Sequence, residues 1–121
     1  MVVGHYGCGG VLAALQKARV GLVDFWLDNV QQVHNKHLAL VDNLPEEQRH
    51  ARLCELNVLE QVVSLVNTPV VKDAWARGQT LTIHGWIYGL KDGLVHDLGI
   101  TVDCPQDLNT RYDAALKALD A

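Results

Sequence analysis

A histidine and a cysteine lie three residues apart near the start of this 121-residue chain, in a glycine-rich turn that reads Gly4-His5-Tyr6-Gly7-Cys8-Gly9-Gly10. Neutral imidazole and thiolate groups suit Zn²⁺, but a tetrahedral site needs four ligands, or three and a water molecule. His5 and Cys8 therefore predict half of a zinc site. Gly9 and Gly10 leave backbone N–H groups free to face an anion at the N-terminus of the next helix. The alternative for these two glycines is a tight turn that needs positive φ angles.

The elements that would position this turn alternate between helices and strands. An apolar strand end at 1–3 precedes the turn, and apolar residues at helical spacing predict a helix from Val11. The same kind of pattern predicts helices over 22–40, 46–67 and 69–77, strands over 81–88 and 94–102, and a last helix over 108–119. Because both faces of 81–88 carry apolar or aromatic residues, this strand is expected to be covered on both sides. Residues 1–121 are thus predicted to form a single α/β domain, with a mainly parallel sheet flanked by helices.

The overall composition argues against several classes of partner. The formal net charge is −4 and the basic residues are scattered, so we expect no nucleic-acid partner. No leader pattern is visible, and no apolar run approaches the ~18 residues that a membrane span requires. We therefore expect no membrane partner and a cytoplasmic protein. The three cysteines are widely spaced and odd in number, which suits a reducing compartment better than a disulfide framework.

Two further blocks accompany the turn from Gly4 to Val11. They are Cys54-Glu55-Leu56-Asn57-Val58 with Gln61, and Ile83-His84-Gly85-Trp86-Ile87-Tyr88-Gly89 with Asp92-Gly93. In this order the three blocks resemble β-class carbonic anhydrases of the bacterial type. The resemblance implies a partial β-carbonic-anhydrase fold and the zinc-dependent, reversible hydration of carbon dioxide to bicarbonate, with His5 and Cys8 as zinc ligands. Tyr88 matches a position that helps to bind regulatory bicarbonate in one branch of the family, and the alternative is a packed strand aromatic.

One motif of that family is missing from the chain. Upstream, family members carry Cys-x-Asp-x-Arg, which supplies the second cysteine ligand and an aspartate–arginine pair, and none of Cys8, Cys54 and Cys104 begins such a motif. The resemblance therefore implies a truncated, C-terminal portion of the enzyme, with no catalytic residue assigned and impaired or absent activity. The alternative is a catalytically dead remnant that acts as an oligomerisation or partner-binding module through its apolar helices. In both cases we expect a homo-oligomer, because strands without neighbours expose unpaired backbone groups.

The remaining candidate residues have less specific patterns. His34 and His37 are three residues apart, and without a nearby acid they are expected to form a partly exposed helix face. His84 is expected to be a hydrogen-bonded core histidine rather than a proton shuttle. A nucleotide phosphate loop is the weakest alternative for the glycine-rich turn, which lacks both Gly-x-Gly-x-x-Gly and a P-loop lysine.

Overall fold

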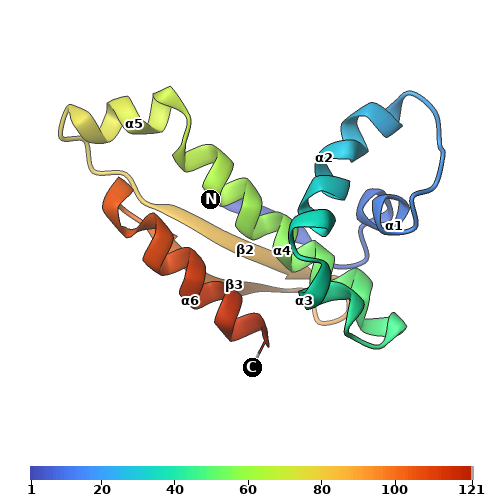
Figure 1. The fold of residues 1–121 in the computed structure, drawn as a ribbon. Coiled ribbons are helices and arrows are strands. Elements are labelled where there is room, and N and C mark those ends of the chain that lie inside the picture. The colour runs from blue at the N-terminus through green and yellow to red at the C-terminus, as the bar shows by residue number, and fades with distance from the viewer. Residues whose placement is uncertain (121) are drawn as a thin grey trace.

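Helices and strands alternate along the chain in the computed structural model, which describes residues 1–120 (Figure 1). β1 (Val2–His5) leads through a turn into α1 (Gly9–Leu15), and the long α4 (Glu46–Val66) runs through the middle of the molecule. The other elements are α2 (Val23–Lys36), α3 (Leu38–Asp42), α5 (Pro69–Ala76), β2 (Ile83–Gly89), β3 (Leu94–Val102), the 3-10 turn η1 (Pro105–Asp107) and α6 (Leu108–Asp120). The predicted α/β fold class is confirmed.

The strands form one sheet in the order β1-β2-β3. β1 is parallel to β2, with Val3 opposite Trp86 and His5 opposite Tyr88. β2 is antiparallel to β3, with Tyr88 opposite Val95. The short connection at 90–93 explains this second pairing, because a tight hairpin joins antiparallel strands whereas parallel strands need a long crossover. The sheet is therefore mixed, with one parallel pair and one antiparallel pair.

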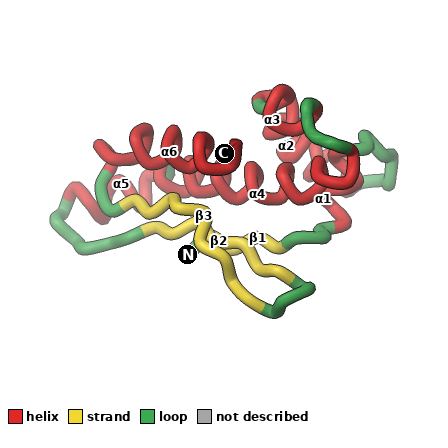
Figure 2. Tube along the Cα trace, turned by 90° about the horizontal axis from the view of Figure 1, so that it is seen from below, coloured by secondary structure: helices red, strands yellow, loops and turns green. Residues whose placement is uncertain are grey.

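Helices α4 and α6 pack on the same face of this sheet (Figure 2). Along β2 the residues Ile83, Gly85 and Ile87 are buried against them, whereas the alternate residues 84, 86 and 88 on the opposite face are only partly buried. His84 hydrogen-bonds Thr101 Oγ1 at 3.2 Å on that second face, as expected of a strand histidine. The prediction that 81–88 is covered on both sides is therefore wrong for the described residues, because their helices cover one side.

Two glycines allow α4 to lie close to the strands. A Cβ atom added to Gly4 would lie 2.5 Å from Val58 Cγ2, which is closer than real Cβ contacts. A Cβ atom on Gly85 would lie 2.5 Å from Ile100 Cγ2 and 3.0 Å from Val62 Cγ2. Val58 and Val62 of α4 lie beneath these glycines, and Leu53, Leu56, Leu59 and Val66 of the same helix are buried as well.

The helix predicted over 22–40 is split in two. α2 ends at Lys36, and His37 has φ −122° and ψ 35°, outside the helical range, before α3 begins at Leu38. His34 and His37 are both buried, so the prediction of a partly exposed histidine face is wrong. The reason is that acids reach them from other elements: His34 Nε2 lies 2.8 Å from Asp42 Oδ1, and His37 Nε2 lies 2.8 Å from Glu60 Oε1.

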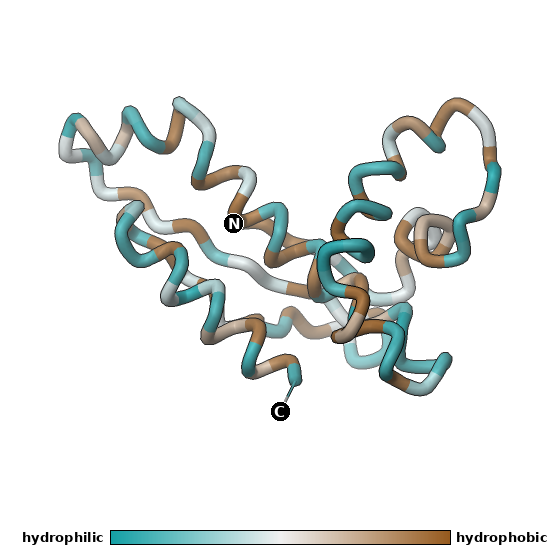
Figure 3. The backbone as a smooth tube through the Cα atoms, viewed as in Figure 1, coloured by the Kyte–Doolittle hydropathy of each residue, from teal (hydrophilic) through white to brown (hydrophobic). Residues whose placement is uncertain are grey.

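The start of α2 carries apolar side chains that the fold leaves exposed. Phe25 is 81% exposed and Trp26 is 74% exposed, and they follow Leu22, which is 87% exposed. Figure 3 shows brown, hydrophobic stretches of the backbone at the end of α2 that lies away from α4. The predicted continuous apolar face of 22–40 is thus buried only from Leu27 onward. Among residues 1–120, no helix combines the length and the apolar character that crossing a membrane would require.

Candidate functional site

The predicted metal turn connects the end of β1 to the start of α1. Tyr6 N donates to Tyr88 O at 2.9 Å, so the turn continues the parallel pairing of β1 with β2. Gly7 then adopts φ +71°, which reverses the chain. Neither Gly9 nor Gly10 has a positive φ, so the alternative of a strained turn at these two residues is wrong and Gly7 occupies that conformation instead. Cys8 is the N-cap residue of α1, with φ −65° and ψ 120°.

The ring of His5 is oriented by its own turn. His5 Nδ1 lies 2.9 Å from the carbonyl oxygen of Tyr6. Because a carbonyl oxygen only accepts, Nδ1 carries a proton in this bond, and in the neutral ring Nε2 then has the free lone pair. A ligating histidine in metalloproteins commonly donates its other ring N–H to a backbone carbonyl or a carboxylate. The exposed His5 ring is therefore in a tautomer that can bind a metal through Nε2.

The backbone of Cys8 accepts hydrogen bonds from two helices, α1 and α4. Its carbonyl oxygen accepts from Leu12 N at 3.0 Å, which is the first hydrogen bond of α1, and from His50 Nε2 at 2.7 Å. Burial raises the pKa of the neighbouring thiol of Cys54, and the backbone N–H groups of Cys8 and Gly7 act in the opposite direction. Cys54 is thus a buried residue beneath the turn, and Cys8, which is half-buried, is the more accessible of these two thiols.

A polar network lies behind the turn. Tyr6 Oη donates to Glu55 Oε2 at 3.0 Å, and Glu55 Oε1 lies 3.7 Å from Arg52 Nε. Burial, followed by the charge of Glu55, raises the pKa of the Tyr6 hydroxyl, so this group stays protonated as a donor. Burial also raises the pKa of Glu55, although the Tyr6 hydroxyl and Arg52 oppose the increase. Arg52 in turn donates to the carbonyl oxygen of Leu119 at 2.6 Å, which connects the turn to α6.

Tyr88 lies beside His5 in the sheet register, on the partly exposed face. A Cβ atom added to Gly93 would lie 3.9 Å from the Tyr88 hydroxyl, so the ring reaches toward the β2–β3 turn. His5 and Tyr88 therefore lie side by side at one end of the sheet, next to the turn that carries Cys8. The anion-binding role of Gly9 and Gly10 and the bicarbonate role of Tyr88 stay predictions.

Sequence patterns did not identify His50, Cys54 or Glu55 as neighbours of the turn. His50 and Cys54 are one turn apart on α4, and their partners at the metal turn are backbone atoms of Cys8 and Gly7. Every residue has backbone atoms, so a sequence pattern cannot indicate a hydrogen bond to the backbone of a particular residue. These contacts become visible only in the packing of α4 under the turn. Tyr6 and Glu55 do fall inside the blocks that carry the family resemblance, which was the available signal.

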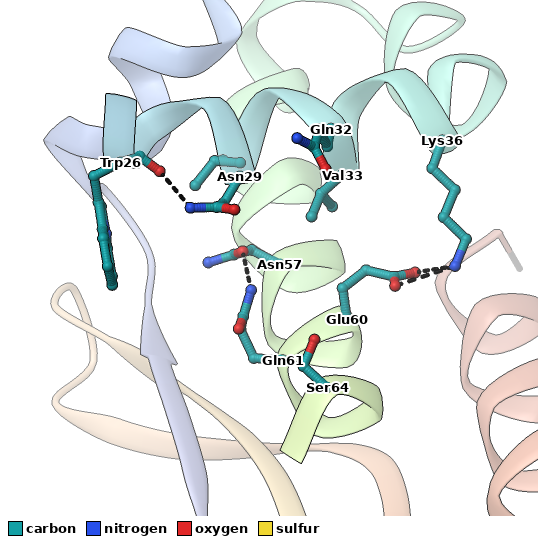
Figure 4. A pocket seen from close by; sticks show the side chains of 10 residues that line it. Trp26, Asn29, Gln32, Val33, Lys36, Asn57, Glu60, Gln61 and Ser64 are labelled. Carbon is teal, nitrogen blue, oxygen red and sulfur yellow. Dashed lines mark hydrogen bonds and ion pairs between the residues drawn. The ribbon is translucent and has the colours of Figure 1, made fainter. Parts of the chain in front are cut away.

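Two cavities lie near these elements. One, of about 480 Å³, adjoins the metal turn and is lined in part by Gly7, His50, Leu90 and His96. Another, of about 750 Å³, separates α2 from α4 and contains neither His5 nor Cys8 (Figure 4). Its walls are largely polar, and Lys36 and Glu60 close one side with an ion pair of 3.1 Å. Neither cavity is lined by His5 or Cys8, but the smaller one adjoins the turn between them through Tyr6 and Gly7.

A group of three residues elsewhere could also share a cation. Ligand atoms of Asp103, Cys104 and Asp107 lie within 4.8 Å of one another, and in residues 1–120 no other such triple of His, Cys, Asp or Glu is present. This group follows Val102, which pairs with Ile83, whereas His5 pairs with Tyr88 at the other end of β2. It is therefore separate from the predicted zinc residues, and exposed acidic groups commonly cluster without a cation.

Known proteins resemble this chain over most of its length. Residues 1–95 match the family model for carbonic anhydrase. A carbonic anhydrase of Emericella nidulans is 41% identical over 101 residues, which cover 83% of this chain and 44% of that protein. A carbonic anhydrase of Candida albicans is 30% identical over 116 residues, which cover 93% of this chain and 41% of that protein. The chain thus spans less than half the length of these two relatives.

Solved structures have the same fold. A β-carbonic anhydrase of Coccomyxa in complex with acetazolamide superposes with a TM-score of 0.84 and 30% identity, over 99% of this chain and 57% of that chain. A tetrameric β-carbonic anhydrase of Sordaria macrospora superposes with a TM-score of 0.74 and 34% identity, over 83% of this chain and 51% of that chain.

Proposed function

We propose, because this chain belongs to the β-class carbonic anhydrase family, that it contributes to the zinc-dependent, reversible hydration of carbon dioxide to bicarbonate. The chain covers only part of each relative, so the activity of a whole enzyme is a proposal for this sequence. The observation that carries the proposal is the tautomer of His5, whose Nδ1 donates to Tyr6 O and whose Nε2 is free, three residues before the half-buried thiol of Cys8.

His5 and Cys8 would hold Zn²⁺ through an imidazole nitrogen and a thiolate, which together suit this ion. Zinc would supply Lewis-acid chemistry, by activating water for attack on the carbon of CO₂. The residues of this chain bind and orient: Tyr6 O fixes the His5 ring, and the helix N-terminus at Gly9 and Gly10 would present N–H groups to bicarbonate. No residue of the chain is assigned as catalytic in this proposal.

Two ligands do not complete a tetrahedral site, which needs four ligands or three and a water molecule, so further ligands are required. We propose that they come from a segment with the Cys-x-Asp-x-Arg pattern, and that the isolated chain has impaired or no activity. The free edge of β1 and the uncovered face of the sheet support this proposal. His5 lies on that edge strand, where an added strand could bring further ligands next to it.

The experiment measures zinc content and CO₂ hydration by stopped flow. The chain alone should bind Zn²⁺ weakly and hydrate CO₂ slowly or not at all, and adding a segment with the Cys-x-Asp-x-Arg pattern should raise both zinc content and rate. Cys8→Ser should abolish that gain. If Cys8→Ser keeps the zinc and the activity of the reconstituted protein, Cys8 is not a ligand and the proposal fails.

A second candidate function, an oligomerisation or partner-binding module without catalysis, is favoured by the exposed apolar residues at the start of α2. Leu22, Phe25 and Trp26 are each more than 70% exposed, and exposed apolar patches commonly mark interaction sites. We propose a homo-oligomer for the same reason, in keeping with the tetrameric Sordaria enzymes. Light scattering should show an assembly larger than the 13.3 kDa monomer, and a Phe25→Ser/Trp26→Ser variant should shift it toward the monomer. A monomeric parent chain would contradict this proposal.

A further inference from the structure

A side chain of α4 holds the backbone of the proposed zinc ligand Cys8. His50 Nε2 lies 2.7 Å from Cys8 O, and since a carbonyl oxygen can only accept, Nε2 carries the proton and donates. The same oxygen also accepts from Leu12 N at 3.0 Å. His50 therefore connects α4 to the residue at which the turn becomes α1.

The next turn of α4 carries Cys54, which belongs to the buried core against which Cys8 packs. Cys54 follows His50 by four positions, so both side chains lie on one face of the helix. α4 thus reaches Cys8 through the hydrogen bond from His50 and through the packing of Cys8 against the core that contains Cys54.

We propose that His50 is a positioning residue, which fixes Cys8 so that its sulfur meets a metal ion shared with His5. This inference rests on the proposed function, because it takes Cys8 to be a zinc ligand. Partners that orient metal ligands typically account for a 10–100-fold effect on metal affinity. Removing the His50 donor leaves Cys8 O with its bond from Leu12 N, so no buried acceptor loses its last partner. The loss should therefore appear in metal binding more than in folding.

The surroundings of His50 allow informative substitutions. His50 is half-buried and lines the cavity of about 480 Å³, which can accommodate a different side-chain shape. His50→Gln keeps an N–H donor close to the position of Nε2. His50→Leu removes the donor, and the side chain in His50→Asn is too short for its N–H donor to reach Cys8 O. His96→Leu is the matched control, because His96 lines the same cavity but hydrogen-bonds Asp92 Oδ2 at 2.8 Å instead of the metal turn.

The test measures Zn²⁺ affinity of the full chain by competition with a chromophoric chelator, Co²⁺ absorption as a report on ligand geometry, and thermal unfolding without metal. His50→Leu and His50→Asn should bind Zn²⁺ about 10–100-fold more weakly and change the Co²⁺ spectrum, with metal-free unfolding near that of the parent chain. His50→Gln and His96→Leu should resemble the parent in both metal measurements.

Cys8→Ser distinguishes this inference from the proposed function. If Cys8→Ser weakens Zn²⁺ binding while His50→Leu and His50→Asn do not, His50 has no positioning role and only the present proposal is overturned. If Cys8→Ser binds Zn²⁺ as tightly as the parent chain, Cys8 is not a ligand and the proposed function is overturned as well.

Discussion

The close packing of α4 against the sheet predicts that Gly85→Ala destabilises the fold. The added Cβ atom would lie 2.5 Å from Ile100 Cγ2 and 3.0 Å from Val62 Cγ2, whereas carbon atoms in ordinary contact are about 3.5–4.0 Å apart. Ile100 and Val62 are fully buried, so neither can move toward solvent. Strands β2 and β3 must move apart by roughly 1 Å at Gly85 and Ile100, and α4 must give way at Val62, and overpacking of this kind typically costs about 1–3 kcal/mol.

A small opposing term comes from the unfolded chain. Alanine has less backbone freedom than glycine when unfolded, which stabilises a folded protein by about 0.4–1 kcal/mol where the site accepts the side chain. The net loss for Gly85→Ala should be about 1–2 kcal/mol, out of a total stability of about 5–15 kcal/mol. At about 4 °C per kcal/mol for a domain of this size, the unfolding temperature should fall by about 4–8 °C.

Gly9→Ala is the matched control for this experiment. Gly9 has no atom within 4 Å of a Cβ position and no positive φ, so alanine fits there without strain. Calorimetry without metal should show Gly9→Ala at or slightly above the parent unfolding temperature, and Gly85→Ala clearly below it. Equal unfolding temperatures for the two variants would refute the inference that Gly85 is required by contact with Ile100 and Val62.

Two further predictions concern an acid on α4 and the turn. Burial raises the pKa of Glu60, but hydrogen bonds from Tyr112, His37 and Lys36 outweigh it, and the net pKa lies below the usual value. A depressed carboxyl pKa adds stability that is present above the unfolded pKa of about 4.3 and is lost as pH falls through the folded pKa. Tyr112→Phe should therefore lower the free energy of unfolding by about 1–2 kcal/mol at pH 7, and the variant should lose less stability than the parent chain on acidification. Urea titrations at pH 7 and below pH 4 measure both effects. An equal loss of stability on acidification in the two proteins would contradict this prediction. Gly7 has φ +71°, so Gly7→Ala should lower the free energy of unfolding by about 1 kcal/mol, and Gly7→Asn should lower it less. Equal unfolding temperatures for the parent chain and the two variants would contradict this prediction.

The sequence predicted those elements whose signals are local. The apolar spacing along 46–67 located α4 and its buried stripe, and the alternation around Ile83 and Ile87 located β2. The break at His37 was not predicted, because the acid that pairs with this histidine is Glu60, on another helix. Periodicity also could not show that Phe25 and Trp26 would be exposed, since an apolar stripe does not reveal which of its residues the rest of the fold reaches.

In the candidate site, too, the sequence predicted the local features and not the contacts that depend on tertiary packing. His5, Cys8 and the glycines around them form a local motif, and the structure adds the tautomer of His5 and the positive φ of Gly7. His50 could not be identified, because its acceptor is the carbonyl of Cys8, and every residue has a carbonyl. The spacing of His50 and Cys54 on one helix face becomes meaningful only when α4 is known to pass beneath the turn.

The two halves of α4 make different contacts, so substitutions near one half should affect stability and substitutions in the other should affect metal binding. Its C-terminal half packs through Val58 and Val62 against glycines of the strands, where extra volume strains the core. Its N-terminal half contacts the metal turn through hydrogen bonds at the edge of a cavity, where a lost donor leaves room and leaves Cys8 O with another partner. Because these contacts are formed by different residues of one rigid helix, Gly85→Ala should lower the unfolding temperature with little effect on Zn²⁺ affinity, and His50→Leu should do the reverse. The effects should add in the double variant, since the two sites have no common partner among the contacts named here.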